Sequence, residues 1–236
     1  MVKLDVGAAS ELISALTARG YKAYAVGGCV RDLLCGKKPC DYDIATSALP
    51  DEVAEVFSEY KVIGTGLKHG TVTVIVGGKP YEITTFRKDG DYADGRRPDS
   101  VQFVGDIVGD LSRRDFTVNA MAYNDEDGLI DPFGGEADLK NKILRCVGEP
   151  ERRFKEDALR ILRAVRFCAV CGFTPEENTV NAATRLRDGL KRVSAERIFA
   201  ELNKTLLGDY VVGALLKFRK VIFAVIPELA PCDGFK

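Results

Sequence analysis

The sequence predicts an α+β fold in which a mixed or antiparallel sheet flanked by helices is followed by an all-helical part. Three observations predict it. Short apolar and β-branched runs alternate with helical patterns over the first 145 residues, longer helical patterns fill the chain beyond Gly148, and the net charge changes sign at the same place. We therefore expect two domains, residues 1–148 and residues 149–236.

The first part predicts short helices and strands in alternation. Ser10 is a candidate helix cap, and Pro50 suits the first turn of a helix. In chain order the expected elements are helix 9–19, strand 21–26, helix 30–34, strand 42–46, helix 50–57 and strands 71–76, 81–86 and 101–104. The Gly77-Gly78 pair predicts a hairpin between two of these strands.

The polar run from Arg87 to Ser100 predicts a mobile loop. Beyond Gly148 the helical patterns cover residues 151–170, 176–186, 194–207 and 211–226. No apolar run approaches the roughly 20 residues that span a bilayer, and the first residues lack an apolar signal core. We therefore expect a cytoplasmic protein without membrane contact.

The amino-acid composition excludes some kinds of catalytic and metal site. The single histidine, His69, excludes a two-histidine metal site and paired catalytic histidines within one chain. Seven cysteines without a paired framework predict reduced thiols, with Cys168 and Cys171 in the core. Residues 1–144 hold 17 basic and 23 acidic side chains, a net charge of −6, and residues 145–236 hold 17 and 12, a net charge of +5. This asymmetry suggests a metal and phosphate site beside a polyanion-binding surface, although two ordinary solvated surfaces fit the charges equally well.

Three carboxylates are the candidate catalytic groups. Asp41 and Asp43 lie two residues apart at the start of an expected strand, so they share one face. Glu82 is an isolated acid within another apolar strand and needs a partner. Oxygen ligands favour Mg²⁺, and acids converging from two strands are typical of two-metal phosphoryl or nucleotidyl transfer. An acid pair alone is more often a surface turn.

A glycine turn precedes these acids. The expected strand 21–26 runs into Gly27-Gly28 and then into a helix that carries Arg31. Glycine permits close approach of the backbone, amide groups at a helix start bind phosphate, and arginine adds a bidentate contact. Beside an acid pair, this turn predicts a site for a triphosphate.

Together these motifs resemble the head-domain signature of class II tRNA nucleotidyltransferases and bacterial poly(A) polymerases, within the polymerase-β-like superfamily. The resemblance covers about residues 20–207. The segments that carry it are Val26–Asp32, Asp41–Thr46, Gly64–Val74, Tyr81–Arg87, Arg113–Met121, Asp131–Gly135, Glu156–Phe167 and Ser194–Ile198.

The resemblance implies a role for each matching residue. Asp41 and Asp43 would hold two Mg²⁺ ions, with Glu82 as the third catalytic acid. The implied triphosphate and ribose contacts are Gly27, Gly28, Arg31, Arg113, Arg114, Asp115 and Asn119. Without the resemblance, two adjacent arginines before a short helix would be interpreted as a surface salt-bridge pair.

The resemblance also implies that Asp157 and Arg160 select the base of the nucleotide. We expect them on one face of a helix, three residues apart, where the plainer interpretation is a surface ion pair. Cytosine and adenine both present an amino donor beside a ring-nitrogen acceptor, which suits a carboxylate and a guanidinium. Uracil and guanine present a carbonyl instead. Arg163 and Arg166 would orient Arg160 or contact RNA.

The implied function is addition of C and A to the tRNA 3′ end from CTP and ATP, by attack of the 3′-OH on the α-phosphate. The segment Gly64–Gly70 resembles the CCA-adding version, and the run 87–98 is intact where CC-adding enzymes are shortened. A-adding, CC-adding and poly(A)-synthesising enzymes stay open, as does a fragment that binds nucleotide or RNA without turnover. The family's body and tail domains are expected to be absent, and the sequence leaves the oligomeric state open.

Overall fold

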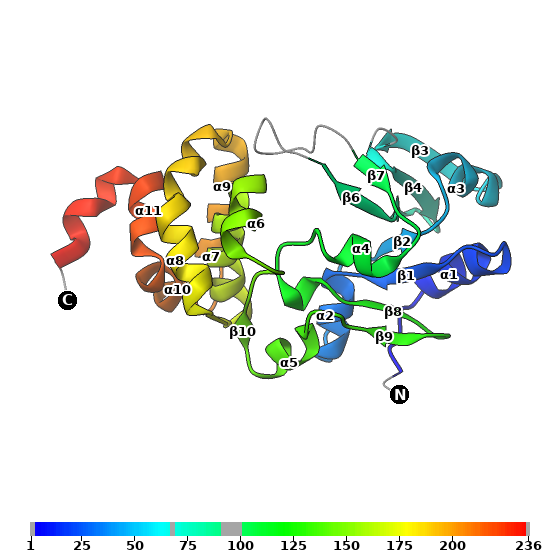
Figure 1. Ribbon diagram of the computed structural model, residues 1–236, viewed down its shortest axis with the longest axis horizontal. Coiled ribbons are helices and arrows are strands. Elements are labelled where there is room, and N and C mark those ends of the chain that lie inside the picture. Colours follow the sequence, from blue (N-terminus) through cyan, green and yellow to red (C-terminus); the bar gives the residue numbers. More distant parts are fainter. Residues whose placement is uncertain (1–2, 67–68, 91–100, 235–236) are drawn as a thin grey trace. The chain divides into compact units, whose positions relative to one another are not determined.

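The computed structural model of the chain describes residues 3–66, 69–90 and 101–234, which form two compact units. The first unit contains the described residues up to Gly90 and residues 101–137, and the second unit begins at Asp138. Figure 1 labels the helices and strands of both. The first unit thus ends ahead of the domain boundary that we predicted after residue 148.

A mixed sheet forms the centre of the first unit. Among the described residues its strand order is β3-β4-β5-β2-β1-β8-β9, with β2 and β5 parallel and the other neighbours antiparallel. The strands are β1 (Ala23–Val26), β2 (Asp43–Thr46), β3 (Lys61–Gly66), β4 (Thr71–Val76), β5 (Lys79–Thr85), β8 (Ala122–Asn124) and β9 (Gly128–Ile130). The predicted mixed sheet is confirmed, and so is the hairpin, because Gly77 and Gly78 both have positive φ between β4 and β5.

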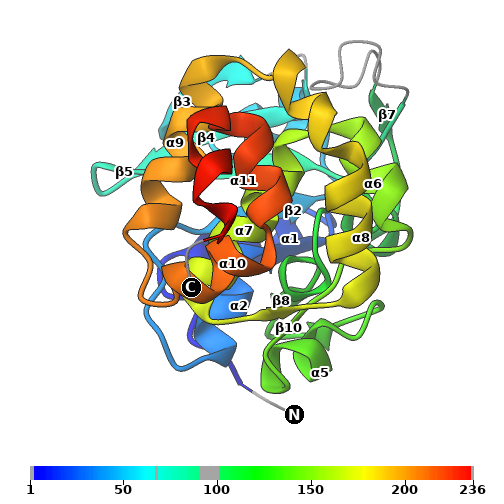
Figure 2. The ribbon, with the colours of Figure 1, turned by 90° about the vertical axis from the view of Figure 1, so that its left-hand side faces the viewer.

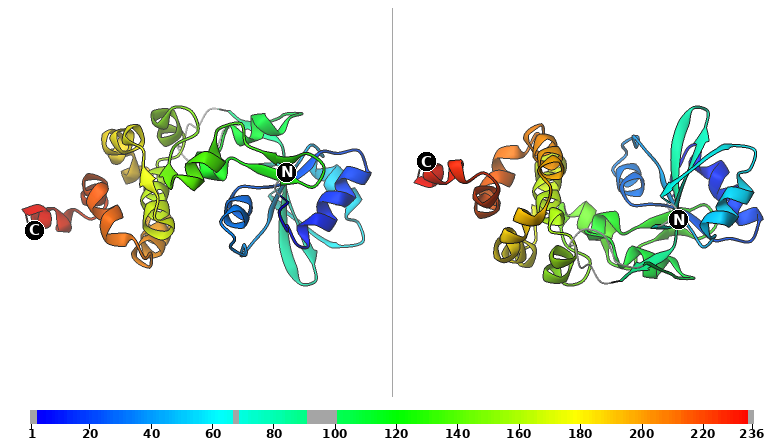
Figure 3. Two further views of the ribbon diagram at one scale, coloured as in Figure 1. Left: turned by 90° about the horizontal axis from the view of Figure 1, so that it is seen from below. Right: turned by 90° about the horizontal axis from the view of Figure 1, so that it is seen from above.

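Helices cover both faces of this sheet. They are α1 (Ala9–Ala18), α2 (Gly28–Leu34), α3 (Pro50–Val56), α4 (Ile107–Leu111) and α5 (Gly135–Lys140), the last of which runs into the second unit. Figure 3 shows α1 and α3 on one face and α2 on the other. The predicted cap Ser10 is wrong, because α1 begins at Ala9 and places Ser10 inside its first turn.

Part of the predicted loop is a strand. Residues of β6 (Arg87–Asp89) pair antiparallel with β7 (Val101–Phe103). Residues 91–100 lie outside the described residues, and so do residues 67–68 of the segment that favoured CCA addition.

The second unit is built mainly of helices (Figure 2), and its described residues also include a short parallel strand pair that the all-helical prediction missed. Its elements are β10 (Ile143–Leu144), α6 (Pro150–Glu156), α7 (Leu159–Cys171), β11 (Thr174–Pro175), α8 (Glu177–Leu186), the 3₁₀ helix Arg187–Arg192, α9 (Ala195–Leu206), α10 (Val211–Lys217), α11 (Arg219–Val225) and the 3₁₀ helix Pro227–Gly234. No helix among the described residues is both long and apolar enough to span a membrane.

Two predicted helices are each broken in two. The helix expected over 211–226 is interrupted at Phe218. The helix expected over 151–170 is interrupted at Asp157, whose backbone is extended with φ −145° and ψ 108°. The Asp157 carboxylate accepts a hydrogen bond from the Leu159 amide at 3.0 Å. This local hydrogen bond competes with the backbone hydrogen bonds of a continuous helix, so α6 ends and a separate helix, α7, begins after it.

Candidate functional site

The sheet brings the predicted carboxylates of the first unit together. Asp43 is the first residue of β2, where it pairs with Val26 of β1 on one side and with Glu82 of β5 on the other. Paired residues on neighbouring strands point to the same face, and both acidic side chains are exposed there. Asp41 is also exposed and lies just before the strand. The strand Ala23–Val26, fully buried, anchors this arrangement.

These acids repel one another. Protein atoms around the carboxylate of Asp43 remove part of its hydration, which raises the pKa of Asp43. The positive charge of Arg114 opposes this rise, while the negative charges of Asp41 and Glu82 add to it. Excess negative charge at this point favours the binding of a cation.

The donor set fits a hard cation. Asp41 and Asp43 offer carboxylate oxygens, and Mg²⁺ is usually bound by one or two carboxylates together with water and substrate phosphates. Within residues 3–66, 69–90 and 101–234, no three His, Cys, Asp or Glu side chains gather into a metal site. The preference of Mg²⁺ for a few carboxylates beside water and phosphate oxygens is what Asp41 and Asp43 would satisfy.

The predicted glycine turn lies directly beside these acids. Gly27 follows β1 and precedes α2, with φ 75° and ψ −125°, a conformation that essentially only glycine adopts. A Cβ at this position would lie 2.7 Å from Nη1 of Arg114. The absence of a side chain at Gly27 is what allows the guanidinium of Arg114 to lie against the turn.

Replacing Gly27 with alanine tests this close approach. We expect Gly27→Ala to lower the free energy of unfolding and to displace Arg114, whereas Gly20→Ala is the matched control. Gly20 also has positive φ, 85°, but nothing lies within 4 Å of its Cβ position. Both variants place alanine at positive φ, which costs about 1–3 kcal/mol of backbone strain, and Gly27→Ala alone adds the clash with Arg114. Equal urea midpoints for the two variants would contradict the argument.

A hydrogen-bonded chain joins three other predicted residues. Nη1 of Arg31 donates to Oδ1 of Asn119 at 2.6 Å, and Nδ2 of Asn119 donates to Oδ1 of Asp115 at 3.2 Å. Arg31 also bonds Asp32 through Nε at 2.9 Å and Nη2 at 2.7 Å. Asp115 and Asn119 are buried, so the chain fixes the guanidinium of Arg31 against the body of the unit.

The anchor of the two adjacent arginines is Asp110, which the sequence reasoning missed. Asp110 is fully buried and binds Nη2 of Arg113 at 2.9 Å and Nη2 of Arg114 at 3.2 Å. Burial alone would raise the pKa of Asp110, but the two guanidinium groups overcome it and the pKa is lowered. The sequence does contain a signal for this role: Asp110 is a lone acid in the apolar run Ile107–Leu111, and two arginines follow it by one helical turn.

Removing the charge of Asp110 should destabilise the first unit. We expect Asp110→Asn to lower the free energy of unfolding by about 2–4 kcal/mol at neutral pH, because two partly buried arginines lose their counter-ion. The folded-state pKa is lowered, so this stabilisation is present at neutral pH and is lost as the pH falls through that pKa. Urea unfolding should therefore show a smaller loss of stability in acid for Asp110→Asn than for the unchanged chain.

The exposed Glu136 provides the control, since Glu136→Gln also removes one negative charge from the first unit. If both substitutions have the same effect, Asp110 is not the anchor.

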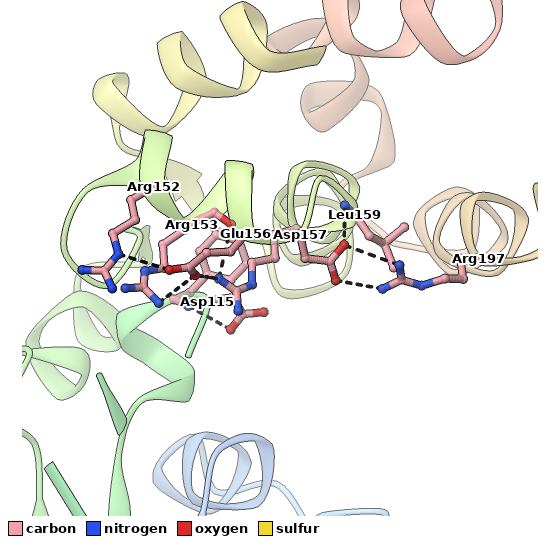
Figure 4. Close-up of polar contacts among 9 residues, drawn as sticks. Asp115, Arg152, Arg153, Glu156, Asp157, Leu159 and Arg197 are labelled. Carbon is pink, nitrogen blue, oxygen red and sulfur yellow. Dashed lines mark hydrogen bonds and ion pairs between the residues drawn. The ribbon is translucent and has the colours of Figure 1, made fainter. Parts of the chain in front are cut away.

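In the second unit, Asp157 and Arg160 meet through the backbone, where the Arg160 amide donates to the Asp157 carbonyl at 3.0 Å. Asp157 lies in the break between α6 and α7, so the expectation of a shared helical face is wrong. Its Oδ2 binds Nη2 of Arg197 at 2.8 Å, as Figure 4 shows. Nη1 of Arg160 binds Oε2 of Glu156 at 2.6 Å. Each member of the predicted base-selecting pair is thus held by a different partner.

Glu156 gathers three arginines of the second unit. Besides Arg160, it binds Nη1 of Arg153 at 2.9 Å and Nε of Arg152 at 3.2 Å (Figure 4). Arg153 and Arg160 are mostly buried, with side-chain exposures of 7% and 12%, whereas Arg152 is exposed. Glu156 therefore fixes Arg160, a role that the sequence reasoning did not assign to it.

The remaining predicted arginines pack along α7. Arg166 binds the buried carboxylate of Glu201 at 2.6 Å and lies 4.2 Å from the ring centroid of Phe167. Arg163 lies 5.6 Å from the same centroid. These contacts join α7 to α9 and hold Arg197, also on α9, within reach of Asp157.

Two family profiles match the chain. The first, described as Poly A polymerase head domain, matches residues 23–145. The second, described as Probable RNA and SrmB- binding site of polymerase A, matches residues 172–232.

Curated relatives and solved structures agree with the first profile. A CCA-adding enzyme of Oceanobacillus iheyensis is 50% identical over 207 residues, which cover 88% of this chain and 51% of the relative. One from Geobacillus kaustophilus is 48% identical over 220 residues, 93% of this chain and 54% of the relative. The crystal structure of the Bacillus stearothermophilus CCA-adding enzyme in complex with CTP matches with a TM-score of 0.81 at 47% identity, covering 89% of this chain and 50% of that one.

The Thermotoga maritima CCA-adding enzyme complexed with tRNA_CCA matches with a TM-score of 0.76 at 32% identity, covering 93% of this chain and 52% of that one. The chain thus spans about half the length of the curated relatives that it matches. The profile match, the shared mixed sheet and the order of the motifs agree: the chain belongs to the poly(A) polymerase head-domain family.

Proposed function

We propose that this chain is the nucleotide-adding part of a tRNA nucleotidyltransferase. It adds C and A to the tRNA 3′ end from CTP and ATP, by in-line attack of the 3′-OH on the α-phosphate with pyrophosphate as leaving group. The observation that carries the proposal is the in-register pair Asp43 and Glu82, with Asp41 close by. The close relatives named CCA-adding enzymes support it.

The first unit provides the phosphate chemistry. Asp41 and Asp43 would hold Mg²⁺, and Glu82 adds negative charge beside them. The chemistry that the metal supplies when bound is activation of the 3′-OH and neutralisation of phosphate charge. Gly27 and Gly28 offer backbone to the triphosphate.

Arginines complete that part of the site. Arg31 is fixed by Asn119 and offers its guanidinium to the phosphates. Arg114, held with Arg113 by Asp110, adds positive charge beside the carboxylate of Asp43. Asp115 and Asn119 form the polar patch that we assign to the ribose, where a contact to the 2′-OH distinguishes ribonucleotides.

The second unit provides base selection. The carboxylate of Asp157 accepts a hydrogen bond from the amino group of cytosine or adenine, and Arg160 donates to the adjacent ring nitrogen. A carbonyl at the amino position, as in uracil and guanine, faces the carboxylate without a donor. Arg197 and Glu156 hold these two side chains in place before the nucleotide binds.

Equilibrium binding of the four nucleotides tests this assignment. In the presence of Mg²⁺, we expect calorimetry to give CTP and ATP dissociation constants at least about tenfold lower than those of UTP and GTP. Equal affinities for all four nucleotides would contradict a protein-based selection of C and A.

A further inference from the structure

The first unit contains a pocket that the proposed function does not use. It has a volume of about 250 Å³ and is lined by α1, by Val6 ahead of it and by the turn between β8 and β9 (Figure 1). Asn124, the last residue of β8, lines the pocket and donates to the carbonyl of Ala23, the first residue of β1. The glycine turn instead follows the last residue of β1. The pocket and the proposed triphosphate site therefore lie at opposite ends of that strand.

One side of the pocket is a row of hydroxyl groups on α1. Ser10, Ser14 and Thr17 follow one another at helical spacing, so they share a face of the helix over about 10 Å. The hydroxyl of Thr17 donates to the carbonyl of Ile13 at 2.9 Å, which leaves its oxygen as an acceptor. The side chains of Ser10 and Ser14 have no partner among the described residues. The row therefore presents oxygen acceptors to a ligand.

The turn after β8 adds two carboxylates to the lining. Asp125 and Glu126 are both exposed. Oδ1 of Asp125 accepts a hydrogen bond from the hydroxyl of Tyr123 at 3.0 Å, which holds this carboxylate in place. Within the part of the chain that the structure describes, no lysine, arginine or histidine lines the pocket. This negative charge is uncompensated locally, and residues 1–144 as a whole carry a net charge of −6.

Val6 and Ile13 give the pocket an apolar surface. Both side chains are buried, and Ala18 continues the lining at the end of α1. A metal ion would use only the carboxylates and water, so an apolar surface would add nothing to its binding. A ligand that uses the whole lining combines positive charge with an aliphatic stem.

We propose that this pocket binds a linear aliphatic polyamine. One ammonium group pairs with the carboxylates of Asp125 and Glu126, a second donates to the hydroxyl row of α1, and the methylene groups between them cover Val6 and Ile13. An ammonium group has three donors and no acceptor, which suits a lining of carboxylate and hydroxyl oxygens. None of these residues belongs to the proposed nucleotide site, so the two proposals are independent.

Calorimetry on the full chain, without RNA or nucleotide, tests the proposal with spermidine as the probe. The uncharged α,ω-octanediol is the matched control ligand, because it has the same number of non-hydrogen atoms on a similar stem. Glu126→Gln removes one carboxylate from the pocket and preserves its shape. Glu11→Gln is the control variant, since Glu11 is an exposed acid of α1 that lies outside the lining.

We expect spermidine to bind the unchanged chain with a dissociation constant below about 1 mM, which is within reach of a ligand of about ten non-hydrogen atoms. Glu126→Gln should weaken binding about three- to fivefold, the upper part of the range for an exposed charge pair, and Glu11→Gln at most about 1.5-fold. Added salt should weaken binding by the unchanged chain.

A second variant blocks the pocket instead of changing its charge. Ser14→Leu places a larger side chain in the lining and should abolish spermidine binding, while thermal melting stays close to that of the unchanged chain because leucine is a good helix former. CTP affinity should be unchanged in all three variants, which separates this pocket from the proposed nucleotide site.

Four results would overturn the proposal. Equal binding of spermidine and the diol would show an apolar pocket that does not select for charge. Equal weakening by Glu126→Gln and Glu11→Gln would show attraction to the net charge of the first unit. Undiminished binding by Ser14→Leu would place the amine elsewhere, and the absence of binding by the unchanged chain at millimolar spermidine would exclude the site.

Discussion

Replacing Asp43 with asparagine is expected to reduce nucleotide addition by about a hundredfold to a thousandfold while leaving the protein folded. Asp43 lies on β2 and pairs with a residue of each neighbouring strand, β1 and β5. Its loss therefore removes negative charge from the centre of the proposed cation site. Its raised pKa means that the folded state disfavours the ionised carboxylate. Asparagine carries no charge, so the folded state of the variant does not bear this cost, and the melting temperature should be unchanged or higher.

This combination separates a functional acid from a structural one. Glu55→Gln is the control, because Glu55 is an exposed acid of α3. Nucleotide incorporation and thermal melting are measured on both variants and on the unchanged chain. If Asp43→Asn keeps full activity, the carboxylates are not the catalytic centre; if it unfolds the protein, Asp43 is a structural residue.

Changing Asp157 should change which nucleotide is accepted. An asparagine at this position offers an amide N–H as well as a carbonyl oxygen, so it satisfies the carbonyl of uracil as well as the amino group of cytosine. We expect the preference for CTP over UTP to fall by about 10- to 100-fold in Asp157→Asn, the range set by losing one well-placed hydrogen-bond pair. The ratio of incorporation efficiencies for the two nucleotides measures it.

Arg197 should affect the ratio of CTP to UTP incorporation through its contact with Asp157. Because Arg197 binds Oδ2 of Asp157 at 2.8 Å, Arg197→Gln frees the carboxylate to move, and Arg197→Lys should restore part of the selectivity. Asp209→Asn removes an exposed acid elsewhere in the second unit and should leave the ratio unchanged. A uniform loss of rate with an unaltered CTP/UTP ratio in Asp157→Asn would exclude base selection by this residue.

Local sequence patterns were sufficient to assign the candidate acids to strands. Asp43 and Glu82 were placed correctly because period-2 alternation and β-branched runs define β2 and β5. The sequence did not show that Asp43 and Glu82 would be in register, because that depends on which strands become neighbours in the sheet. The glycine turn was also recognisable, because β1 must end before a helix can begin at Gly28.

Long-range pairing explains one residue that the sequence analysis left out. Arg197 binds Asp157, which lies 40 positions away, and residue type alone does not reveal that partner. Asp110 and Glu156 instead bind arginines three or four positions away, a spacing that the sequence does contain. The break at Asp157 was missed because the apolar periodicity of α6 continues into α7. Only the hydrogen bond from Leu159 to the Asp157 carboxylate shows why the helix restarts.

The most direct test of the whole account is extension of a tRNA transcript that lacks its last three nucleotides, with Mg²⁺ and each nucleotide singly or together. We expect addition of C, C and A when CTP and ATP are both present, no extension by UTP or GTP, and loss of extension in Asp43→Asn. A long run of A from ATP alone would identify a poly(A)-synthesising enzyme instead. Binding of CTP without any extension would contradict the claim that this chain adds nucleotides to tRNA.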